Sequence, residues 1–451
     1  MFTRVLTILP LASAVLGGSI ATLDHLGNLS PYFKAPVPHG VSETLPADCA
    51  VEQVMLVRRV AFWLLAARRN FIYFCQMGRH GSRFPLSSEL PYITNLTFKL
   101  AGAVPAINKA RLPASLAFLK AGYTTALGVN NLTAPGRRQL FDHGVDFRLR
   151  YPDLVATSVL AGNQDRVVES AQWFSQGFFG RYWSDMEADV FSTIEEDAVT
   201  VSWITPMDTC PKWQYAYGQN AVDTWGAVYL PPIAARLNKL VPGVNFTDGD
   251  AHGALYACAY DYAAYAASPW CAVFTADEIL DFEYELDLLM DGAFGYNLPG
   301  AMGPTLGSLF VNKLIERFTN ATGTAQQMYL EFGHDTTIDM ALAALGLAKD
   351  KKPLPASGPV PAGRAFRTST QVPFAAQMVW EKFTCASACT GPQVRLLLND
   401  APFPLAACAK SAFDRTHGSC ALAAFVEANA FSTGIKWGHA AWNATCGAVS
   451  F

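Results

Sequence analysis

One short segment of the chain, Arg79–Pro85 (RHGSRFP), brings together side chains that suit phosphate chemistry. The guanidinium groups of Arg79 and Arg83 are planar forks of N–H donors that match the oxygens of a phosphate. His80, held between them, can attack phosphorus through an unprotonated ring nitrogen and form a covalent phospho-histidine. The segment therefore predicts a site that takes up a phosphoryl group.

Two further polar residues, His334 and Asp335, lie together far downstream in the segment FGHDTT. A histidine can donate a ring N–H to a phosphoryl oxygen, and a carboxylic acid can protonate the oxygen of a departing alcohol. The two segments together predict an enzyme that hydrolyses phosphomonoesters, with His80 as nucleophile, His334 as a phosphate ligand and Asp335 as general acid.

Predicted β-strands lead into both motifs. The continuously apolar run 71–75 precedes the first motif, and the run 327–332 precedes the second. A short strand at 157–160 comes just before Arg166, which opens a helix. Because open α/β sheets bind ligands at the carboxyl ends of their strands, we expect these segments to form one pocket.

Helical periodicity marks three other segments. A helix is expected at 133–150 with Thr133 as its N-cap, and the helix after the second motif is expected to end at Gly346. The middle of the chain, 191–324, is rich in helical patterns, of which 278–290 (EILDFEYELDLLM) is the clearest amphipathic helix.

The two motifs resemble those of the histidine acid phosphatase family (histidine phosphatase superfamily, branch 2), which has the patterns R-H-G-x-R-x-P and H-D. The match is closest to secreted fungal-type phytases, and it covers most of the chain from about Cys49 to the C-terminus. It also includes 132–136, 148–152 (RLRYP), 165–170 (DRVVES), 268–271 (SPWC), 300–304 (GAMGP), 372–374 (VPF) and 394–400 (VRLLLND).

The resemblance implies an α/β fold like that of phosphoglycerate mutase, with a mostly parallel central sheet flanked by helices and a smaller, mainly helical second domain. A chain of 451 residues is long enough for both parts. The expected division is a signal peptide at 1–18, an N-terminal arm at 19–46, a first α/β part at 47–195, a helical domain at 196–324 and a second α/β part at 325–451.

The resemblance also implies a set of phosphate ligands around the nucleophile. Arg166 matches the position at which the family has a third phosphate-binding arginine, in addition to Arg79, Arg83 and His334. The chain has no HExxH segment and no paired Cys/His ligand set. We therefore expect no catalytic metal and no cofactor.

The ten cysteines, an even number, predict disulfides formed in an oxidising compartment. A metal site at Cys385 and Cys389 is the alternative, but no second ligand pair with suitable spacing accompanies them. Cys75 and Cys389 are left without an assigned partner. The resemblance implies the bridges Cys49–Cys385, Cys210–Cys446, Cys258–Cys271 and Cys408–Cys420.

The N-terminus and the sequons predict a secreted glycoprotein that is free of the membrane after signal cleavage. Arg4 and an apolar run from Val5 to Leu16 are typical of a signal peptide, and the run is too short for a membrane anchor. The net charge of −4 argues against a nucleic-acid partner. Six N-x-[S/T] sequons occur, at Asn28, Asn95, Asn131, Asn245, Asn320 and Asn443.

One segment, 60–79, has no counterpart in the family. In the family, the R-H-G motif begins ten residues after a cysteine. In this chain, Arg59 lies ten residues after Cys49, and no histidine follows it. Twenty residues correspond to sixty nucleotides, and valine codons begin with GT, so we interpret the segment as a retained intron. A genuine insertion is the alternative. If translated, the segment either displaces 51–57 from the first strand or supplies 71–75 in its place.

The sequence leaves the substrate open. Overall similarity favours phytate, a dense polyanion that a dedicated phytase should surround with lysine and arginine. After Pro85, however, the chain continues LSSEL with no base until Lys99, which favours a broad-specificity acid phosphatase. Two rivals remain: a family member whose catalysis is impaired by 60–79, and a mutase-like transferase, for which disulfides and sequons are not expected.

Overall fold

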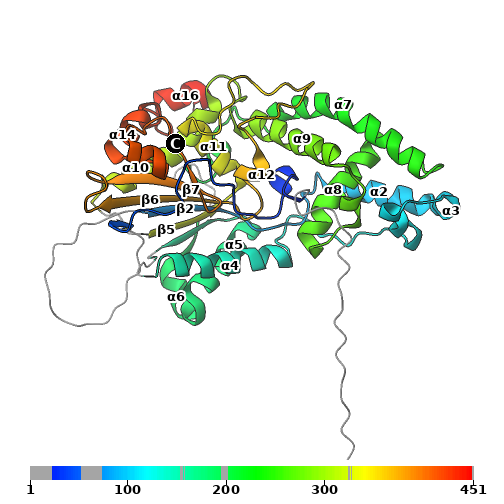
Figure 1. Cartoon of the computed structure of the whole chain (residues 1–451), viewed down its shortest axis with the longest axis horizontal. Coiled ribbons are helices and arrows are strands. Elements are labelled where there is room, and N and C mark those ends of the chain that lie inside the picture. The colour runs from blue at the N-terminus through cyan, green and yellow to red at the C-terminus, as the bar shows by residue number, and fades with distance from the viewer. Residues whose placement is uncertain are drawn as a thin grey trace, which may run out of the picture.

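A single sheet forms the centre of the molecule (Figure 1). The computed structural model describes residues 23–51, 74–152, 156, 158–194, 202–323, 326 and 328–448. Within these residues nine strands follow the path β4-β3-β5-β2-β6-β7-β8, with β1 paired to β6 and β9 paired to β7. The strands are β1 (Cys49–Val51), β2 (Phe74–Arg79), β3 (Val159–Gly162), β4 (Phe191–Ile194), β5 (Met328–Gly333), β6 (Gln377–Cys385), β7 (Gln393–Leu398), β8 (Ala401–Phe403) and β9 (Ser419–Ala421).

The α/β class is confirmed, but the prediction of a mostly parallel sheet is wrong. Among the described strands, β2, β3, β4 and β5 make three parallel pairings. The other five pairings are antiparallel. Short loops join β6 to β7 and β7 to β8, and strands joined in this way run antiparallel because a parallel pair needs a long crossover.

Helices cover both faces of the sheet (Figure 1). On one face, α4 (Ala134–Arg150) and α5 (Asp165–Phe179) share a buried cluster with β3 and β5. On the other face, α10 (Met302–Thr319) and α11 (Asp335–Leu345) share a cluster with β2 and β6. The shorter helices are α6 (Trp183–Val190), α12 (Thr368–Gln371), α13 (Ala412–His417), α14 (Leu422–Ala428), α15 (Ala430–Thr433) and α16 (Ala440–Cys446).

The predicted helix ends agree with the structure. Thr133 caps α4, where its side-chain oxygen accepts a hydrogen bond of 3.2 Å from the N–H of Gly136. Gly346 ends α11 with a φ of 68°, which glycine adopts without steric cost. The predicted strands at 157–160 and 327–332 are found as β3 and β5, shifted by one or two residues. Residues 157 and 327 lie outside the described residues.

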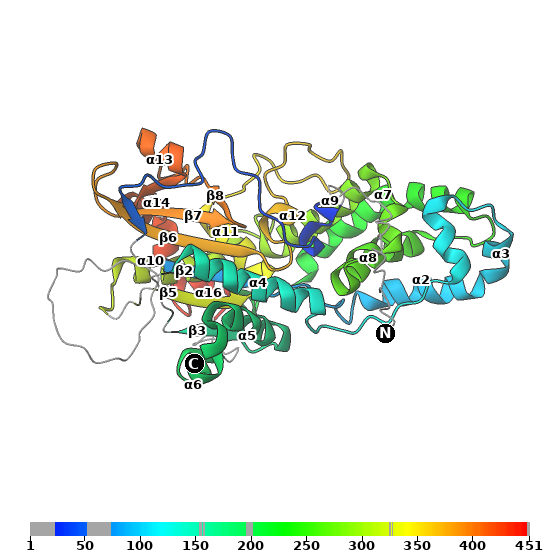
Figure 2. The same ribbon diagram turned by 60° about the horizontal axis from the view of Figure 1, so that its bottom comes forward.

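A second group of helices lies beside the sheet (Figure 2) and shares one apolar cluster. It includes two helices that come from before the predicted helical domain 196–324, whereas α10 adds residues to the cluster around the sheet. We therefore propose that the helical domain consists of residues 90–121 and 216–294. Its helices are α2 (Leu90–Gly102), α3 (Val104–Lys109), α7 (Ala216–Leu240), α8 (Asp248–Tyr265) and α9 (Ala276–Phe294).

Helix α9 is not amphipathic in the predicted sense. Its acidic residues Glu283, Glu285 and Asp287 are as buried as the apolar residues between them. Arg364 binds Glu283 and Asp287 at 2.6 Å each, and Nε2 of His252 lies 2.8 Å from Glu285. The carboxylates face interior partners from distant segments, which the periodicity of one helix could not reveal.

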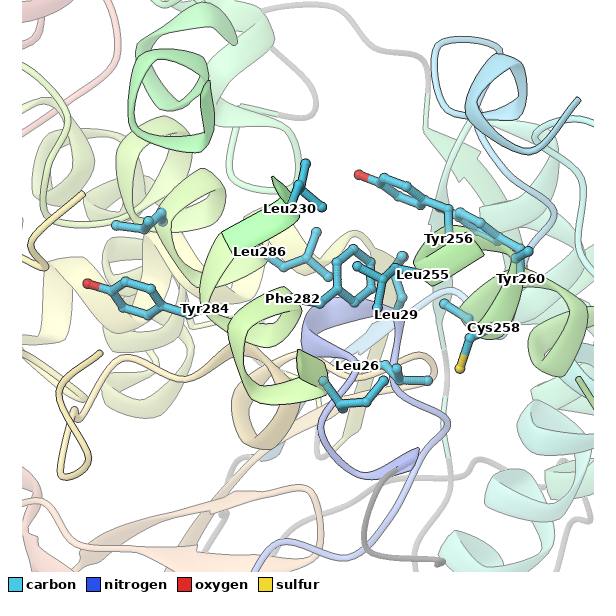
Figure 3. Packing of buried hydrophobic residues seen from close by; sticks show 14 of the residues in the cluster. Leu26, Leu29, Leu230, Leu255, Tyr256, Cys258, Tyr260, Phe282, Tyr284 and Leu286 are labelled. Carbon is cyan, nitrogen blue, oxygen red and sulfur yellow. The ribbon is translucent and has the colours of Figure 1, made fainter. Parts of the chain in front are cut away.

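The described N-terminal residues are anchored in the helical cluster (Figure 3). Leu26 and Leu29 are buried there, the latter in the short turn η1 (Gly27–Leu29). Gly27 has a φ of 58°, and a Cβ at this position would lie 2.6 Å from the side chain of Leu286. The turn thus requires glycine, and the predicted extended arm begins only after it. The predicted signal peptide, 1–18, lies outside the described residues.

The structure joins the four cysteine pairs that the family resemblance implies: Cys49–Cys385, Cys210–Cys446, Cys258–Cys271 and Cys408–Cys420. Cys389 is the described cysteine without a disulfide, and the side chain of Cys75 lies outside the described residues. In the described ranges, no helix combines the length and the apolar character needed to cross a bilayer.

Strands β1 and β2 lie end to end along one edge of β6. Val51 pairs with Phe383, and Phe74 pairs with Glu381. Phe74 follows Val51 by 23 residues in the sequence, but their partners on β6 are only two residues apart. The two strands therefore pair as one continuous strand would, although the sequence between them is 21 residues longer than such a strand needs. The segment 74–79, the end of the part without a family counterpart, forms β2. Of the predicted replacement strand 71–75, residues 74 and 75 lie in β2, and residues 52–57 and 71–73 lie outside the described residues.

Deleting residues 53–73 is expected to preserve the fold, because one residue would then span the gap between Val51 and Phe74 in the observed register. We expect an unchanged or higher unfolding temperature, since a shorter connection between β1 and β2 costs less entropy to close. Calorimetry and phosphate release from p-nitrophenyl phosphate measure this. A variant that no longer folds would show that the deleted residues belong to the core. The variant lacking 60–79 tests the intron interpretation in the same assays.

Candidate active site

The ends of β2 and β5 bring the two motifs together. These strands are parallel neighbours, and Arg79 at the end of β2 faces Gly333 at the end of β5. The residues that follow, His80 and His334, lie side by side with ring centroids 5.7 Å apart. The pairing of the two strands thus creates the pocket.

His80 has the protonation state that a nucleophile needs. Its side chain is buried, and Nδ1 lies 2.9 Å from the carbonyl oxygen of Gly81. A carbonyl oxygen only accepts, so Nδ1 carries the proton and Nε2 keeps its lone pair. Burial, followed by the positive charges of Arg166 and Arg79, holds the pKa of His80 well below its usual value. The ring therefore stays neutral in acid solution.

Arg79 is fully buried and held from several sides. Its Nη1 donates to the backbone carbonyl oxygens of Asn28 and Val372. Its Nη2 lies 2.9 Å from Oδ2 of Asp335, and the guanidinium carbon lies 4.6 Å from the ring centroid of Phe374. Because its position is fixed before any ligand binds, little order is lost when it binds an anion.

Arg166 reaches the pocket from the first turn of α5. Its carbonyl oxygen accepts from the hydroxyl of Ser170 at 2.6 Å, and that hydroxyl accepts from the N–H of Gly81 at 3.1 Å. These bonds connect the helix to the first motif. Burial, followed by the charge of Arg166, lowers the pKa of His334 to about 3. His334 is thus also neutral at mildly acid pH.

Arg83 lies in the same pocket but has protein partners of its own. Its Nη1 lies 3.0 Å from Oε2 of Glu89 and 2.9 Å from the hydroxyl oxygen of Tyr260. Burial would lower the pKa of Arg83, but Glu89, Tyr260 and Asp335 together outweigh burial and raise it. Neither Glu89 nor Tyr260 was predicted from the sequence to lie in the site. The signal for Glu89 was its position six residues after Arg83, a predicted phosphate ligand.

Asp335 lies at the start of α11 among groups that favour its ionised form. Its Oδ2 accepts from the side-chain amide of Asn28 at 2.9 Å, and its Oδ1 accepts from the N–H of Thr336 at 3.0 Å. Burial would raise the pKa of Asp335, but Arg79 and Asn28 outweigh burial and lower it. Beside it, Nε2 of His334 is buried with no hydrogen-bond partner among the described residues, which leaves this atom available to a ligand.

Asn28 belongs to this site, although the sequence marked it only as a sequon. It is 7% exposed, and it contacts Asp335 through its side chain and Arg79 through its backbone. A side chain buried in this way cannot carry a glycan in the folded protein, so the predicted glycosylation at Asn28 is wrong. The remaining sequons stay predictions: Asn95, Asn131 and Asn245 are exposed, and Asn320 and Asn443 are half-buried.

A second carboxyl, Asp339, follows Asp335 by one helical turn. It has no exposed surface, and neither of its oxygens has a hydrogen-bond partner among the described residues. Burial, followed by the negative charge of Asp335, raises the pKa of Asp339 well above its usual value. In the sequence, Asp339 is marked only by its position one helical turn after the predicted general acid and just before the apolar end of the helix.

Asp339 is expected to make the protein less stable as pH rises from about 4 towards neutrality. Below the ordinary aspartate pKa of 3.8 both the folded and the unfolded chain hold the proton. Above it the unfolded chain ionises first, which favours unfolding until the folded group also titrates. Asp339→Asn removes this ionisation, so a stability difference on the order of 1–3 kcal/mol should open between pH 4 and pH 7. Urea unfolding of both proteins measures it, and an equal pH dependence would contradict the assignment.

The described side chains can bind and transfer a phosphoryl group. Three arginines supply positive charge, His80 supplies a neutral nucleophile and Asp335 supplies a carboxyl group. No group of three or more histidine, cysteine, aspartate or glutamate side chains in the described part of the chain could hold a metal ion.

Comparisons with known proteins agree with the motifs. A family model described as "Histidine phosphatase superfamily (branch 2)" matches residues 75–399. A thiamine-repressible acid phosphatase of Schizosaccharomyces pombe is 31% identical, over 95% of this chain and 91% of that protein. Phytase A of Aspergillus fumigatus is 29% identical, over 94% and 90%. The crystal structure of the phytase from D. castellii matches with a TM-score of 0.79 at 24% identity, over 98% and 92%.

Proposed function

The chain belongs to the histidine phosphatase superfamily, branch 2, and is an acid phosphatase, and we propose that it hydrolyses phosphomonoesters by way of a phospho-histidine at His80. The observation that carries this proposal is the position of His80, which is buried with Nδ1 2.9 Å from the carbonyl oxygen of Gly81, so that Nε2 is the ring nitrogen left for phosphorus. The proposed phosphate ligands are Arg79, Arg83, Arg166 and His334, and Asp335 is the proposed general acid.

In the first half of the reaction, Nε2 of His80 attacks phosphorus and the bond to the alcohol oxygen breaks. The arginines stabilise the negative charge that the transferring group carries. Arg79 holds unliganded Asp335 ionised, but a bound phosphoryl group shares the charge of Arg79 and brings negative charge next to Asp335. Substrate binding therefore raises the pKa of Asp335, which takes a proton from acid solution and gives it to the departing oxygen.

In the second half, water attacks the phospho-histidine and releases inorganic phosphate. Asp335, now ionised, accepts a proton from the attacking water, so the carboxyl group is protonated again at the end of the cycle. His80 returns to its neutral form, with Nδ1 still bonded to Gly81. When phosphate leaves, Arg79 again favours the ionised form of Asp335, and the proton taken up in the first half returns to solution, so the net reactants are the ester and water.

Phosphate release from p-nitrophenyl phosphate at acid pH, with a chelator present, tests the proposal on the full chain. We expect turnover that the chelator does not change. No turnover by a folded protein would contradict the proposal and favour the impaired alternative. Recovery of activity in the variant lacking 53–73 would then assign the defect to that segment.

The likeness to Phytase A makes phytate a candidate substrate, whereas the likeness to the thiamine-repressible acid phosphatase favours a broader range of phosphomonoesters. We also propose that the protein is secreted and glycosylated at exposed sequons. The four disulfides support this proposal, since such bonds persist in oxidising compartments. Removal of N-glycans with a glycosidase, followed by electrophoresis of the secreted protein, tests it.

A further inference from the structure

One proposed phosphate ligand, Arg83, already has a carboxylate beside it. Oε2 of Glu89 lies 3.0 Å from Nη1 of Arg83, accepts from the hydroxyl of Tyr260 at 2.5 Å and accepts from the N–H of Leu86 at 2.7 Å. The Tyr260 hydroxyl is also 2.9 Å from Nη1 of Arg83. Glu89 is thus built into the pocket by three described partners and is not a mobile surface charge.

The elements next to Glu89 present tyrosine rings. Tyr260 and Tyr256 of α8 stack with centroids 6.0 Å apart, and Tyr92 of α2 stacks on Tyr256 at 5.3 Å. Tyr92 is 39% exposed and Tyr215 is 46% exposed. Tyr215 stands directly before α7, which packs against α8.

These elements offer little positive charge for a second phosphate. Helices α2 and α8 contain one lysine and no arginine, and that lysine, Lys99, lies 2.8 Å from Oδ2 of Asp250. A substrate with several phosphates would bring its additional groups next to Glu89 and phenol rings. Like charges placed close together are costly, whereas a ring or an uncharged alcohol can pack on tyrosine.

We propose that Glu89 is a specificity-determining residue that selects esters with one phosphate on an aromatic or uncharged alcohol over inositol polyphosphates. The proposal rests on the proposed function, because it concerns the leaving-group side of the same pocket. Glu89 acts in two ways: it balances part of the charge of Arg83, so that less of this charge extends beyond the reacting phosphate to a second one, and it repels that second phosphate directly.

Kinetics of Glu89→Gln with p-nitrophenyl phosphate and with inositol hexakisphosphate test the proposal. The variant retains the shape of the side chain and loses its charge. We expect the ratio of kcat/KM for the hexakisphosphate to that for p-nitrophenyl phosphate to rise about tenfold or more. Glu427→Gln is the matched control, since Glu427 is an exposed carboxylate whose partner is Lys410. The control should leave the ratio unchanged.

An unchanged ratio in an active Glu89→Gln variant would overturn the proposal, and equal losses on both substrates would show that Glu89 only positions Arg83. If the variant does not fold, the substrate preference of the wild-type enzyme tests the proposal instead. It should prefer p-nitrophenyl phosphate by about tenfold or more in kcat/KM, and a preference for the hexakisphosphate would overturn the proposal. A wild-type enzyme active on neither ester would instead contradict the proposed function, and the specificity proposal with it.

Discussion

Replacing His80 with alanine is expected to abolish phosphate release from every ester, with a loss on the order of 10⁴-fold or more in kcat. The imidazole is the proposed group that forms a bond to phosphorus, and the remaining arginines can only bind and polarise the substrate. The neighbouring ring of His334 does not substitute for it, since its proposed role is to hold a phosphoryl oxygen. Aryl and alkyl esters should lose activity alike, because both pass through the same phospho-enzyme.

Trapping the phospho-enzyme makes this prediction specific to His80. Quenching the reaction of a ³²P-labelled ester in alkali preserves phospho-histidine, so the wild-type protein should retain label and His80→Ala should not. His39→Ala is the matched control, because His39 is exposed and outside the site. Label retained on His80→Ala would place the nucleophile on another residue, and His334 would be the first to test.

Replacing Asp335 with asparagine is expected to slow alkyl esters by about 10²–10⁴-fold, the usual contribution of a general acid. A good leaving group such as p-nitrophenolate departs without a proton, so its release should fall by less than about tenfold. The variant retains a side-chain oxygen near Arg79 and Asn28, and the difference between the two esters therefore reports the proton.

Single-turnover alcohol release is the suitable measurement for Asp335→Asn, because it excludes the later attack of water, in which Asp335 also takes part. Glycerol 2-phosphate and p-nitrophenyl phosphate are the ester pair. Asp339→Asn makes the same change one helical turn away and should affect both esters alike. Equal losses of alcohol release from both esters in Asp335→Asn would contradict the general-acid role.

The sequence predicted those parts of the site that depend on local pattern. The two motifs follow strands, so the ends of β2 and β5 could be expected to carry His80 and His334 to one edge of the sheet. Asp335 follows His334 directly and opens a helix, and its position follows from that. Even the cap of α4 at Thr133 was visible, because a capping hydrogen bond spans only three residues.

The missed residues depend on contacts between distant segments. Asn28 reaches Asp335 across a separation of 307 residues, and Tyr260 reaches Arg83 across 177. The antiparallel half of the sheet was also missed. Strands β6 to β9 carry no predicted site residue, and the family resemblance emphasised the parallel strands. A burial pattern along one helix likewise cannot show that Asp287 of α9 faces Arg364.

Because β1 and β2 lie end to end, the position between them is suitable for the insertion of another domain. The register of both strands comes from their shared neighbour β6, not from the chain that joins Val51 to Phe74. Those two residues stand two positions apart along a strand, about 7 Å. A guest domain whose own termini lie about that close could be fused there, and the host would still align His80, the proposed nucleophile, through the strand pairing of β2 with β5 and β6.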